Sequence, residues 1–266
     1  MKSKLALAFA GLAALGLASM DGAEAQTQKV RVATEGAYAP FNYKDTKGEL
    51  QGFDVDIAKA LCAKAKLDCE IVAQDWDGII PGLLAKKYDA IIASMSITEE
   101  RKKSIDFTQK YYQTPARFIR KKGSGIEISE AGLKGKAVGV QRATIHANYI
   151  HQTYGNIVDI KEYDTQENAN LDLVAGRLDL ILADSVVLQE GFLKKPEGAA
   201  FEFVGPELRG KIFGEGAGIG IRKEDTKLKD AFNAALKEIR TDGTYKKIND
   251  KYFPFDVYGP EPAMTN

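Results

Sequence analysis

The sequence contains few of the residues from which metal and nucleophilic sites are built: two cysteines, two histidines and one tryptophan in 266 residues. His146 and His151 have no third ligand in a convenient position, which argues against zinc. The motifs G-x-S-x-G, H-E-x-x-H and C-x-x-C do not occur. We therefore expect no catalytic residue, no metal and no cofactor.

Charge of one sign is not in excess, because Lys+Arg and Asp+Glu both number 37. Nucleic acid and anionic membranes are therefore not expected as partners. The glycine-rich run FGEGAGIGI (213–221) follows an expected linker at 206–211 and does not fit G-x-G-x-x-G or a phosphate loop. It predicts a strand with close backbone packing, and no nucleotide.

Long hydrophobic runs are missing apart from one near the start. Residues 5–18 are apolar, follow two lysines and precede an A-x-A sequence at 23–25. This order is typical of a secretory signal peptide, and the run is too short for a membrane anchor. We predict a signal peptide over residues 1–25, cleaved after Ala25, and an exported, periplasmic mature protein.

Both cysteines lie in the predicted mature chain. In an oxidising compartment Cys62 and Cys69 favour a disulfide, with two buried free thiols as the alternative. A bond over this short loop would stabilise the fold by roughly 2–3 kcal/mol.

The stretch 76–108 has the most informative pattern. An amphipathic helix opening at Asp77 is followed by a buried strand over 90–93 and then by Thr98, a candidate cap of a second helix. Arg101 would lie one turn into that helix, beside its free N–H groups and the hydroxyls at the strand's end. Such donors suit a carboxylate, although a solvated surface arginine is the alternative.

A partial copy of this stretch occurs about ninety residues later. Residues 84–94 align with 174–184, so that Ser94 and Asp184 occupy equivalent strand ends. Ligands of open α/β sheets bind outside the carboxyl ends of the strands. The copy therefore predicts two lobes of similar build with a ligand between them, although two helix–strand units can also be alike by chance.

Eight motifs together resemble those of the polar amino-acid solute-binding proteins of ABC importers. The lysine/arginine/ornithine-binding type is most similar, and opine-binding proteins also resemble the sequence. The motifs are EGAYAPF, GFDVDIAKALC, DWDGIIPGL, YDAIIASMSITEERKKSIDFT, KGKAVGVQ, AGRLDLILAD, FGEGAGIGIRK and DGTYKKINDKYF.

The resemblance implies roles for particular residues. Arg101 would clamp the ligand α-carboxylate, Asp184 would take the α-ammonium and Glu35 the cationic end of the side chain. Aromatic side chains would sandwich the ligand stem, although Trp76 could equally be a packing residue. Glu35 stands where aspartate is frequent, and Gln141 where leucine is expected. The full expected set is Glu35, Tyr38, Trp76, Ser94, Ser96, Arg101, Thr144 and Asp184.

The resemblance also implies a two-lobed, type II periplasmic-binding-protein fold, in which each lobe is a mixed sheet flanked by helices. Lobe one would comprise residues 26–112 and 217–266, and lobe two residues 117–208. Hinges would lie at 113–116 and 209–216.

The implied function is that of a monomeric receptor that closes over free arginine, ornithine or lysine and delivers it to an inner-membrane ABC permease. Two alternatives stay open. One is an exported dehydratase of the cyclohexadienyl type, with Glu35 as proton donor. The other is an opine-binding receptor.

Overall fold

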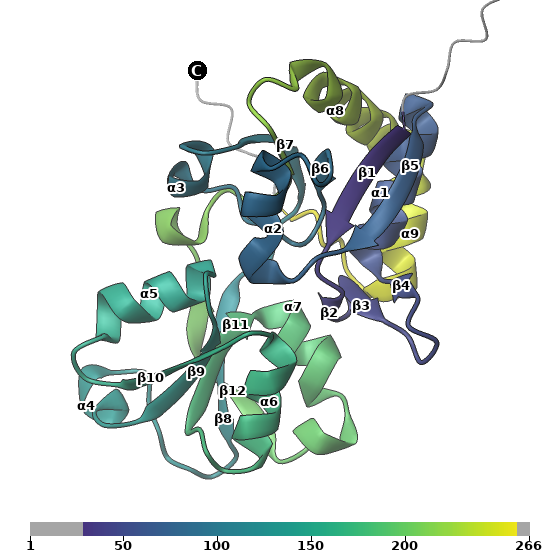
Figure 1. Ribbon diagram of the computed structural model, residues 1–266. Coiled ribbons are helices and arrows are strands. Elements are labelled where there is room, and N and C mark those ends of the chain that lie inside the picture. Colours follow the sequence, from purple (N-terminus) through teal and green to yellow (C-terminus); the bar gives the residue numbers. More distant parts are fainter. Residues whose placement is uncertain (1–28, 260–266) are drawn as a thin grey trace, which may run out of the picture.

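The computed structural model describes residues 29–259, which form two lobes, an upper and a lower one in Figure 1. Each lobe is built around a five-stranded mixed sheet with helices on both faces, which confirms the predicted fold class. The predicted signal peptide (1–25) and the tail (260–266) lie outside the described residues. Within 29–259 we find no helix long and apolar enough to cross a membrane.

The sheet of lobe one has the strand order β5-β1-β6-β13-β7. β1 pairs in parallel with β5 and β6, whereas β13 is antiparallel to β6 and β7. A small antiparallel sheet of β2, β3 and β4 lies beside it. The strands are β1 (Lys29–Thr34), β2 (Ala37–Tyr38), β3 (Asn42–Lys44), β4 (Leu50–Gln51), β5 (Asp68–Ala73), β6 (Ala90–Ile91), β7 (Asp106–Tyr112) and β13 (Ala217–Ile221).

Apolar side chains fill both faces of this sheet. α1, α8 and α9 pack on one face through residues such as Ile57, Phe232 and Tyr245. α2 packs on the other through Ile79 and Leu83. The helices are α1 (Phe53–Ala65), α2 (Trp76–Leu84), α3 (Glu99–Lys102), α8 (Thr226–Thr241) and α9 (Thr244–Tyr252).

A disulfide joins Cys62 in α1 to Cys69 in β5, as predicted. It closes the turn between the helix and the edge strand of lobe one. No free cysteine occurs in the described part of the chain.

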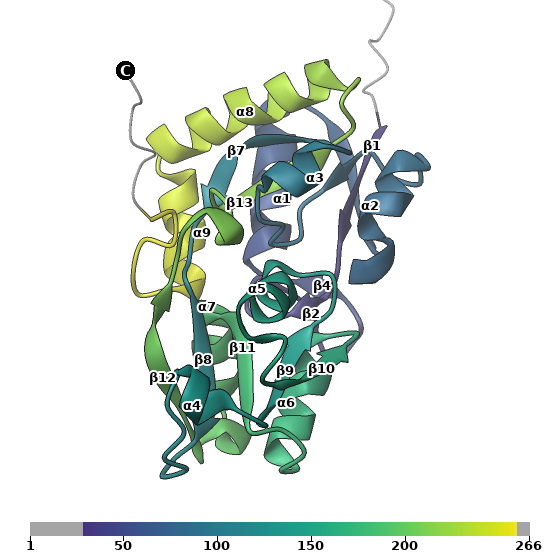
Figure 2. The same cartoon turned by 90° about the vertical axis from the view of Figure 1, so that its left-hand side faces the viewer.

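The sheet of lobe two has the order β10-β9-β11-β8-β12. β9 is parallel to β10 and β11, and β8 is antiparallel to β11 and β12. α4 and α5 cover one face, and α6 and α7 the other (Figures 1 and 2). The elements are β8 (Ala116–Lys121), α4 (Glu130–Leu133), β9 (Ala137–Gln141), α5 (Ile145–Tyr154), β10 (Asp159–Tyr163), α6 (Gln166–Val174), β11 (Leu180–Asp184), α7 (Ser185–Leu188) and β12 (Phe201–Leu208).

The two sheets are built alike. In each, a central strand lies between a parallel partner and an antiparallel one: β6 between β1 and β13, and β11 between β9 and β8. These central strands are the ones that the sequence repeat aligned, each preceded by a helix, α2 or α6. The repeat therefore reflects two lobes of similar build, as predicted, although β6 is shorter than the expected run 90–93.

The chain passes between the sheets twice, from β7 to β8 and from β12 to β13. The second passage differs from the sequence prediction in two ways. Pro206 was expected in a linker but lies inside β12, which is tolerated because β12 is an edge strand with an irregular register at this point. The strand expected from Phe213 begins only at Ala217, because residues 211–213 form a single 3₁₀ turn.

Candidate functional site

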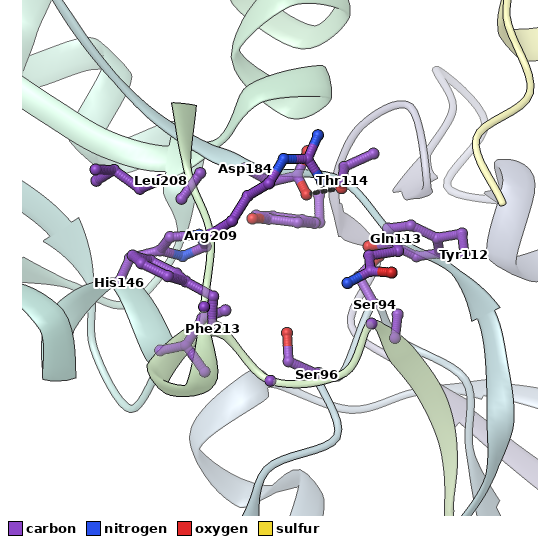
Figure 3. Close-up of a pocket in the computed structure, with 17 residues that line it drawn as sticks. Ser94, Ser96, Tyr112, Gln113, Thr114, His146, Asp184, Leu208, Arg209 and Phe213 are labelled. Carbon is purple, nitrogen blue, oxygen red and sulfur yellow. Dashed lines mark hydrogen bonds between the residues drawn. The ribbon is translucent and has the colours of Figure 1, made fainter. Parts of the chain in front are cut away.

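Two adjoining pockets lie between the lobes. The first, called here the Glu35 pocket, has a volume of about 310 Å³, and the second, the Asp184 pocket, about 530 Å³, both including space open to solvent. In Figure 3 Asp184 and Thr114 lie on one side of the second pocket and Ser96 on the opposite side. All eight residues predicted to bind ligand line one pocket or both: Glu35, Tyr38, Trp76, Ser94, Ser96, Arg101, Thr144 and Asp184.

Arg101 lies in the first turn of α3, where Thr98 caps the helix by accepting from the Arg101 N–H at 3.2 Å. This confirms the predicted cap. The guanidinium donates to the carbonyls of Ser96 (2.9 Å) and Ala143 (3.3 Å) and lies 5.2 Å from the centre of the Trp76 ring. Burial lowers the pKa of Arg101 to about 10. No acidic side chain within 29–259 forms an ion pair with it, so its charge is available to an anion.

Ser94 follows β6 in a left-handed conformation, with φ of 54°. Its N–H donates to the Tyr111 hydroxyl (3.0 Å), and its own hydroxyl donates to the buried carboxylate of Asp54 (2.9 Å). Tyr111 and Asn42 donate to the same carboxylate. Because its one hydroxyl hydrogen is engaged, Ser94 Oγ can only accept from a ligand, as an ammonium requires.

Asp54 was not among the predicted site residues. It lies in the first turn of α1, is fully buried and holds Ser94 in place through the network just described. Burial raises its pKa to about 6. The only signal in the sequence was an acid at the start of an amphipathic helix, which solvent or the helix dipole would explain equally well.

Asp184 ends β11 and caps α7. Its Oδ1 accepts from the N–H groups of Val186 (2.8 Å) and Val187 (3.2 Å), and the Thr114 hydroxyl donates to Oδ2. Burial raises the pKa of Asp184 to about 6, against the opposing effect of these donors. In the described part of the chain no basic side chain pairs with it, so the carboxylate is suited to a cationic ligand group.

Glu35 follows β1 and is 7% exposed. Burial raises its pKa to about 7, although a hydrogen bond from Gln141 opposes this and nearby acids, Asp75 first, add to it. The Gln141 Nε2 donates to Glu35 Oε1 at 2.6 Å from the opposite lobe. Like Asp184, Glu35 has no basic partner among residues 29–259.

Trp76 and Tyr38 are both 9% exposed and border the Glu35 pocket. The Trp76 indole N–H donates to the carbonyl of Ala143 in lobe two at 3.2 Å. Trp76 is also the first residue of α2, one position before the predicted start. Trp76 therefore packs between the lobes and also borders the pocket, so a packing role and a ligand-binding role are compatible.

Thr144 caps α5 as predicted, because its hydroxyl accepts from the Ala147 N–H at 3.1 Å. The same hydroxyl donates to the Gln141 carbonyl at 2.6 Å.

His146, two residues after Thr144, lines both pockets. Burial together with Arg101 lowers the pKa of His146 to about 3, so the ring is neutral. Neither Gln141 nor His146 was a predicted site residue, since their proximity to Glu35 and Arg101 arises only from lobe-to-lobe contact.

Two α/β lobes with charged and aromatic residues facing a shared pocket define a bilobed, type II periplasmic binding protein. The model of the bacterial extracellular solute-binding proteins, family 3, matches residues 30–255. The chain belongs to this family.

Relatives are similar over nearly their whole length. Identity is 49% over 255 residues with the L-arginine-binding protein of Pseudomonas aeruginosa, covering 95% of this chain and 98% of the relative. It is 46% over 234 residues with the lysine/arginine/ornithine-binding periplasmic protein of Escherichia coli K12, covering 87% and 90%. The structure of an ancestral arginine-binding protein bound to arginine has a TM-score of 0.79 at 38% identity, covering 85% of this chain and 98% of that one.

Proposed function

We propose that this protein is a periplasmic receptor for a basic L-amino acid, with arginine preferred over ornithine and lysine. The charges in the two pockets carry the proposal. Arg101 has no acidic partner, and Glu35 and Asp184 have no basic one, among residues 29–259. A ligand that satisfies all three needs one carboxylate and two cationic groups. Free basic amino acids have this set, and two of the similar proteins are named for such ligands, L-arginine and lysine/arginine/ornithine.

Each charged group then has one task. Arg101 binds the α-carboxylate, because a guanidinium fork can pair with both carboxylate oxygens. Asp184 binds the α-ammonium, which also donates to the accepting Ser94 Oγ. Glu35 receives the cation at the end of the side chain, whose aliphatic stem lies between Tyr38 and Trp76. Ser96 and Thr144 complete the polar lining.

The ligand would also drive closure of the two lobes, because Arg101 belongs to lobe one and Asp184 to lobe two. Residues 113–116 and 209–216 would serve as hinges, since they include the two passages between the sheets. The closed, monomeric form would then deliver the amino acid to an inner-membrane ABC permease, as expected for an exported member of this family.

Titration calorimetry with arginine, ornithine, lysine, glutamine and glutamate tests the assignment. We expect arginine to bind with the highest affinity, ornithine and lysine about tenfold less tightly, and glutamine far less, because an amide would leave Glu35 desolvated without a cation. Displacement of arginine by glutamine or glutamate as effectively as by ornithine would contradict the basic-ligand assignment.

Small-angle scattering tests closure separately. The wild-type protein should become more compact when arginine is added. In Asp184→Asn the ligand loses the charge that attracts it to lobe two, so the protein should compact less at equal saturation. An unchanged radius of gyration in saturated wild type would contradict the closure mechanism.

A dehydratase is the second candidate, because Glu35 has a raised pKa and could donate a proton near neutral pH. Loss of prephenate absorbance on incubation with the protein would support it. Opines are a third ligand class to include in the binding measurements. The Asp184 pocket extends beyond that carboxylate toward Arg209, which leaves room for a substituent on the α-nitrogen.

A further inference from the structure

Gln141 joins the two lobes at one end of the Glu35 pocket. It is the last residue of β9 and is 3% exposed. Its Nε2 donates to Glu35 Oε1 at 2.6 Å and to the carbonyl of Asp164 at 3.0 Å. Both amide hydrogens are thus engaged, one by each lobe.

This arrangement changes what Glu35 can offer to a ligand. One carboxylate oxygen already accepts from a neutral donor, and the other has no donor among residues 29–259. The amide oxygen of Gln141 has no hydrogen-bond donor in the described part of the chain, and Gln141 lines the same pocket as Glu35. The end of the pocket therefore offers a charged acceptor from lobe one and a neutral acceptor from lobe two.

We propose that Gln141 is a specificity-determining residue, which favours a ligand guanidinium over a ligand ammonium by adding its amide oxygen to the free oxygen of Glu35. This inference rests on the proposed function. A guanidinium is planar and has N–H donors in several directions, so it can reach two separate acceptors at once. An ammonium is compact and strongly hydrated, and it gains from the charge of Glu35 more than from a neutral amide.

The test is the variant Gln141→Leu, which removes the amide and keeps a side chain of similar size. Arginine affinity should fall by roughly tenfold, the usual loss for one hydrogen bond to a charged group, whereas ornithine and lysine should lose less than about threefold. The quantity to compare is the ratio of the arginine and ornithine dissociation constants, measured by calorimetry. The measurement should be made near pH 8, where Glu35 is largely ionised because its pKa lies at about 7.

Arg142→Gln is the matched control. Arg142 is the next residue. It pairs with Asp77 across the lobes and with Asp164 within lobe two, and it does not line either pocket. Losing this contact should weaken all three ligands by the same factor and leave the ratio unchanged. If Gln141→Leu also leaves the ratio unchanged, or raises the preference for arginine, the inference is overturned and Gln141 only ties the lobes together.

Two further controls separate the possible failures. If the wild-type protein binds none of the three amino acids, the proposed function fails before Gln141 is tested. If Gln141→Leu does not fold, as judged by circular dichroism, Gln141→Met offers the same loss of the amide on an unbranched chain. The same ratio then decides the outcome.

Discussion

Each lobe has an aspartate immediately before its central strand. Comparing the two strands shows which of their ends stabilises the fold and which carries the charges of the site. In lobe one the Asp89 N–H donates to the Arg31 carbonyl at 2.8 Å, and its carboxylate accepts from the Arg31 N–H at 2.9 Å. In lobe two Asp179 makes the same two bonds with Ala137, both at 2.9 Å. Each aspartate thereby fixes its central strand beside a parallel neighbour.

The lobes differ at the opposite ends of the same strands. β6 leads to Ser94 in a left-handed conformation and on to the cationic Arg101, whereas β11 ends in the anionic Asp184. The amino ends of the repeated strands thus hold the fold, and the carboxyl ends hold opposite charges. Two units of similar build can in this way present complementary charges to the two charged groups of a zwitterion.

The largest effect is expected at Arg101, the charge that only lobe one supplies. Arg101→Ala should weaken arginine binding by about 2–5 kcal/mol, because a buried ligand carboxylate is left without its partner. Arg101→Lys should restore only part of this, since an ammonium cannot pair with both oxygens. Calorimetry measures both variants, and near-native affinity in Arg101→Ala would refute the clamp.

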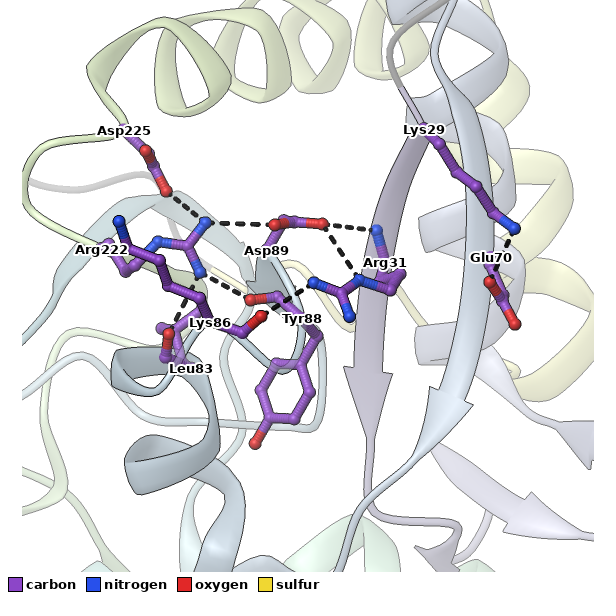
Figure 4. A network of polar contacts seen from close by, with 9 residues as sticks. All are labelled: Lys29, Arg31, Glu70, Leu83, Lys86, Tyr88, Asp89, Arg222 and Asp225. Carbon is purple, nitrogen blue, oxygen red and sulfur yellow. Dashed lines mark hydrogen bonds and ion pairs between the residues drawn. The ribbon is translucent and has the colours of Figure 1, made fainter.

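The two structural aspartates should differ in their contribution to stability. Asp89 also pairs with the buried Arg222 at 3.1 Å and lies 3.7 Å from Arg31 Nε (Figure 4). Among residues 29–259, Asp179 has a single ion pair, with the half-exposed Lys136 at 3.9 Å. Asparagine keeps an oxygen for the shared backbone bond, so the substitution isolates the charge. Asp89→Asn should lower the free energy of unfolding by about 2–3 kcal/mol, and Asp179→Asn by less than about 1.

Urea denaturation of the two variants measures this difference, with Asp179→Asn as the matched control. Equal losses would mean that the Arg222 network adds nothing beyond the backbone bonds. The two aspartates would then contribute equally to the stability of their lobes.

Much of this fold could be predicted from the sequence, because local chemistry determined it. Thr98 and Thr144 were predicted as helix caps from the pattern alone, and the repeat predicted the equivalent central strands of the two lobes. Pro206 misled the prediction, because the sequence does not reveal that β12 is an edge strand where a missing N–H is harmless. Gln141 was outside the predicted site for a related reason, since its partner Glu35 is 106 positions away and in the other lobe.

The acids of the two lobes should also respond differently to pH. Burial raises the pKa of Glu35 in lobe one from 4.5 to about 7 and that of Asp184 in lobe two from 3.8 to about 6. A cationic ligand requires the ionised forms, so arginine affinity should fall as the pH is lowered through 7. The Glu35 step should reach at most about tenfold per pH unit, because one proton is exchanged.

Stability without ligand should change in the opposite sense. The folded state binds the Glu35 proton more tightly than the unfolded chain does, so this contribution is present below pH 4.5 and is lost as the pH rises to about 7. Glu35→Gln should remove this step in both stability and affinity. The step near pH 6, where Asp184 and Asp54 both titrate, should remain. A pH profile of affinity that is identical in Glu35→Gln and wild type would show that Glu35 does not meet the cation.

The smallest effect is expected at Trp76, where the lobes meet. Trp76→Phe removes the 3.2 Å bond to the Ala143 carbonyl and replaces an indole by a smaller face for the ligand guanidinium. Arginine binding should weaken by about 0.5–1.5 kcal/mol, and ornithine binding by less, because a compact ammonium stacks less well. Trp76 is the only tryptophan, so its fluorescence in the wild type should change when arginine closes the lobes around it. Calorimetry with both amino acids separates the lost hydrogen bond from the smaller aromatic face. An equal loss of affinity for arginine and ornithine would assign the effect to the lobe-to-lobe bond and exclude the stacking role of Trp76.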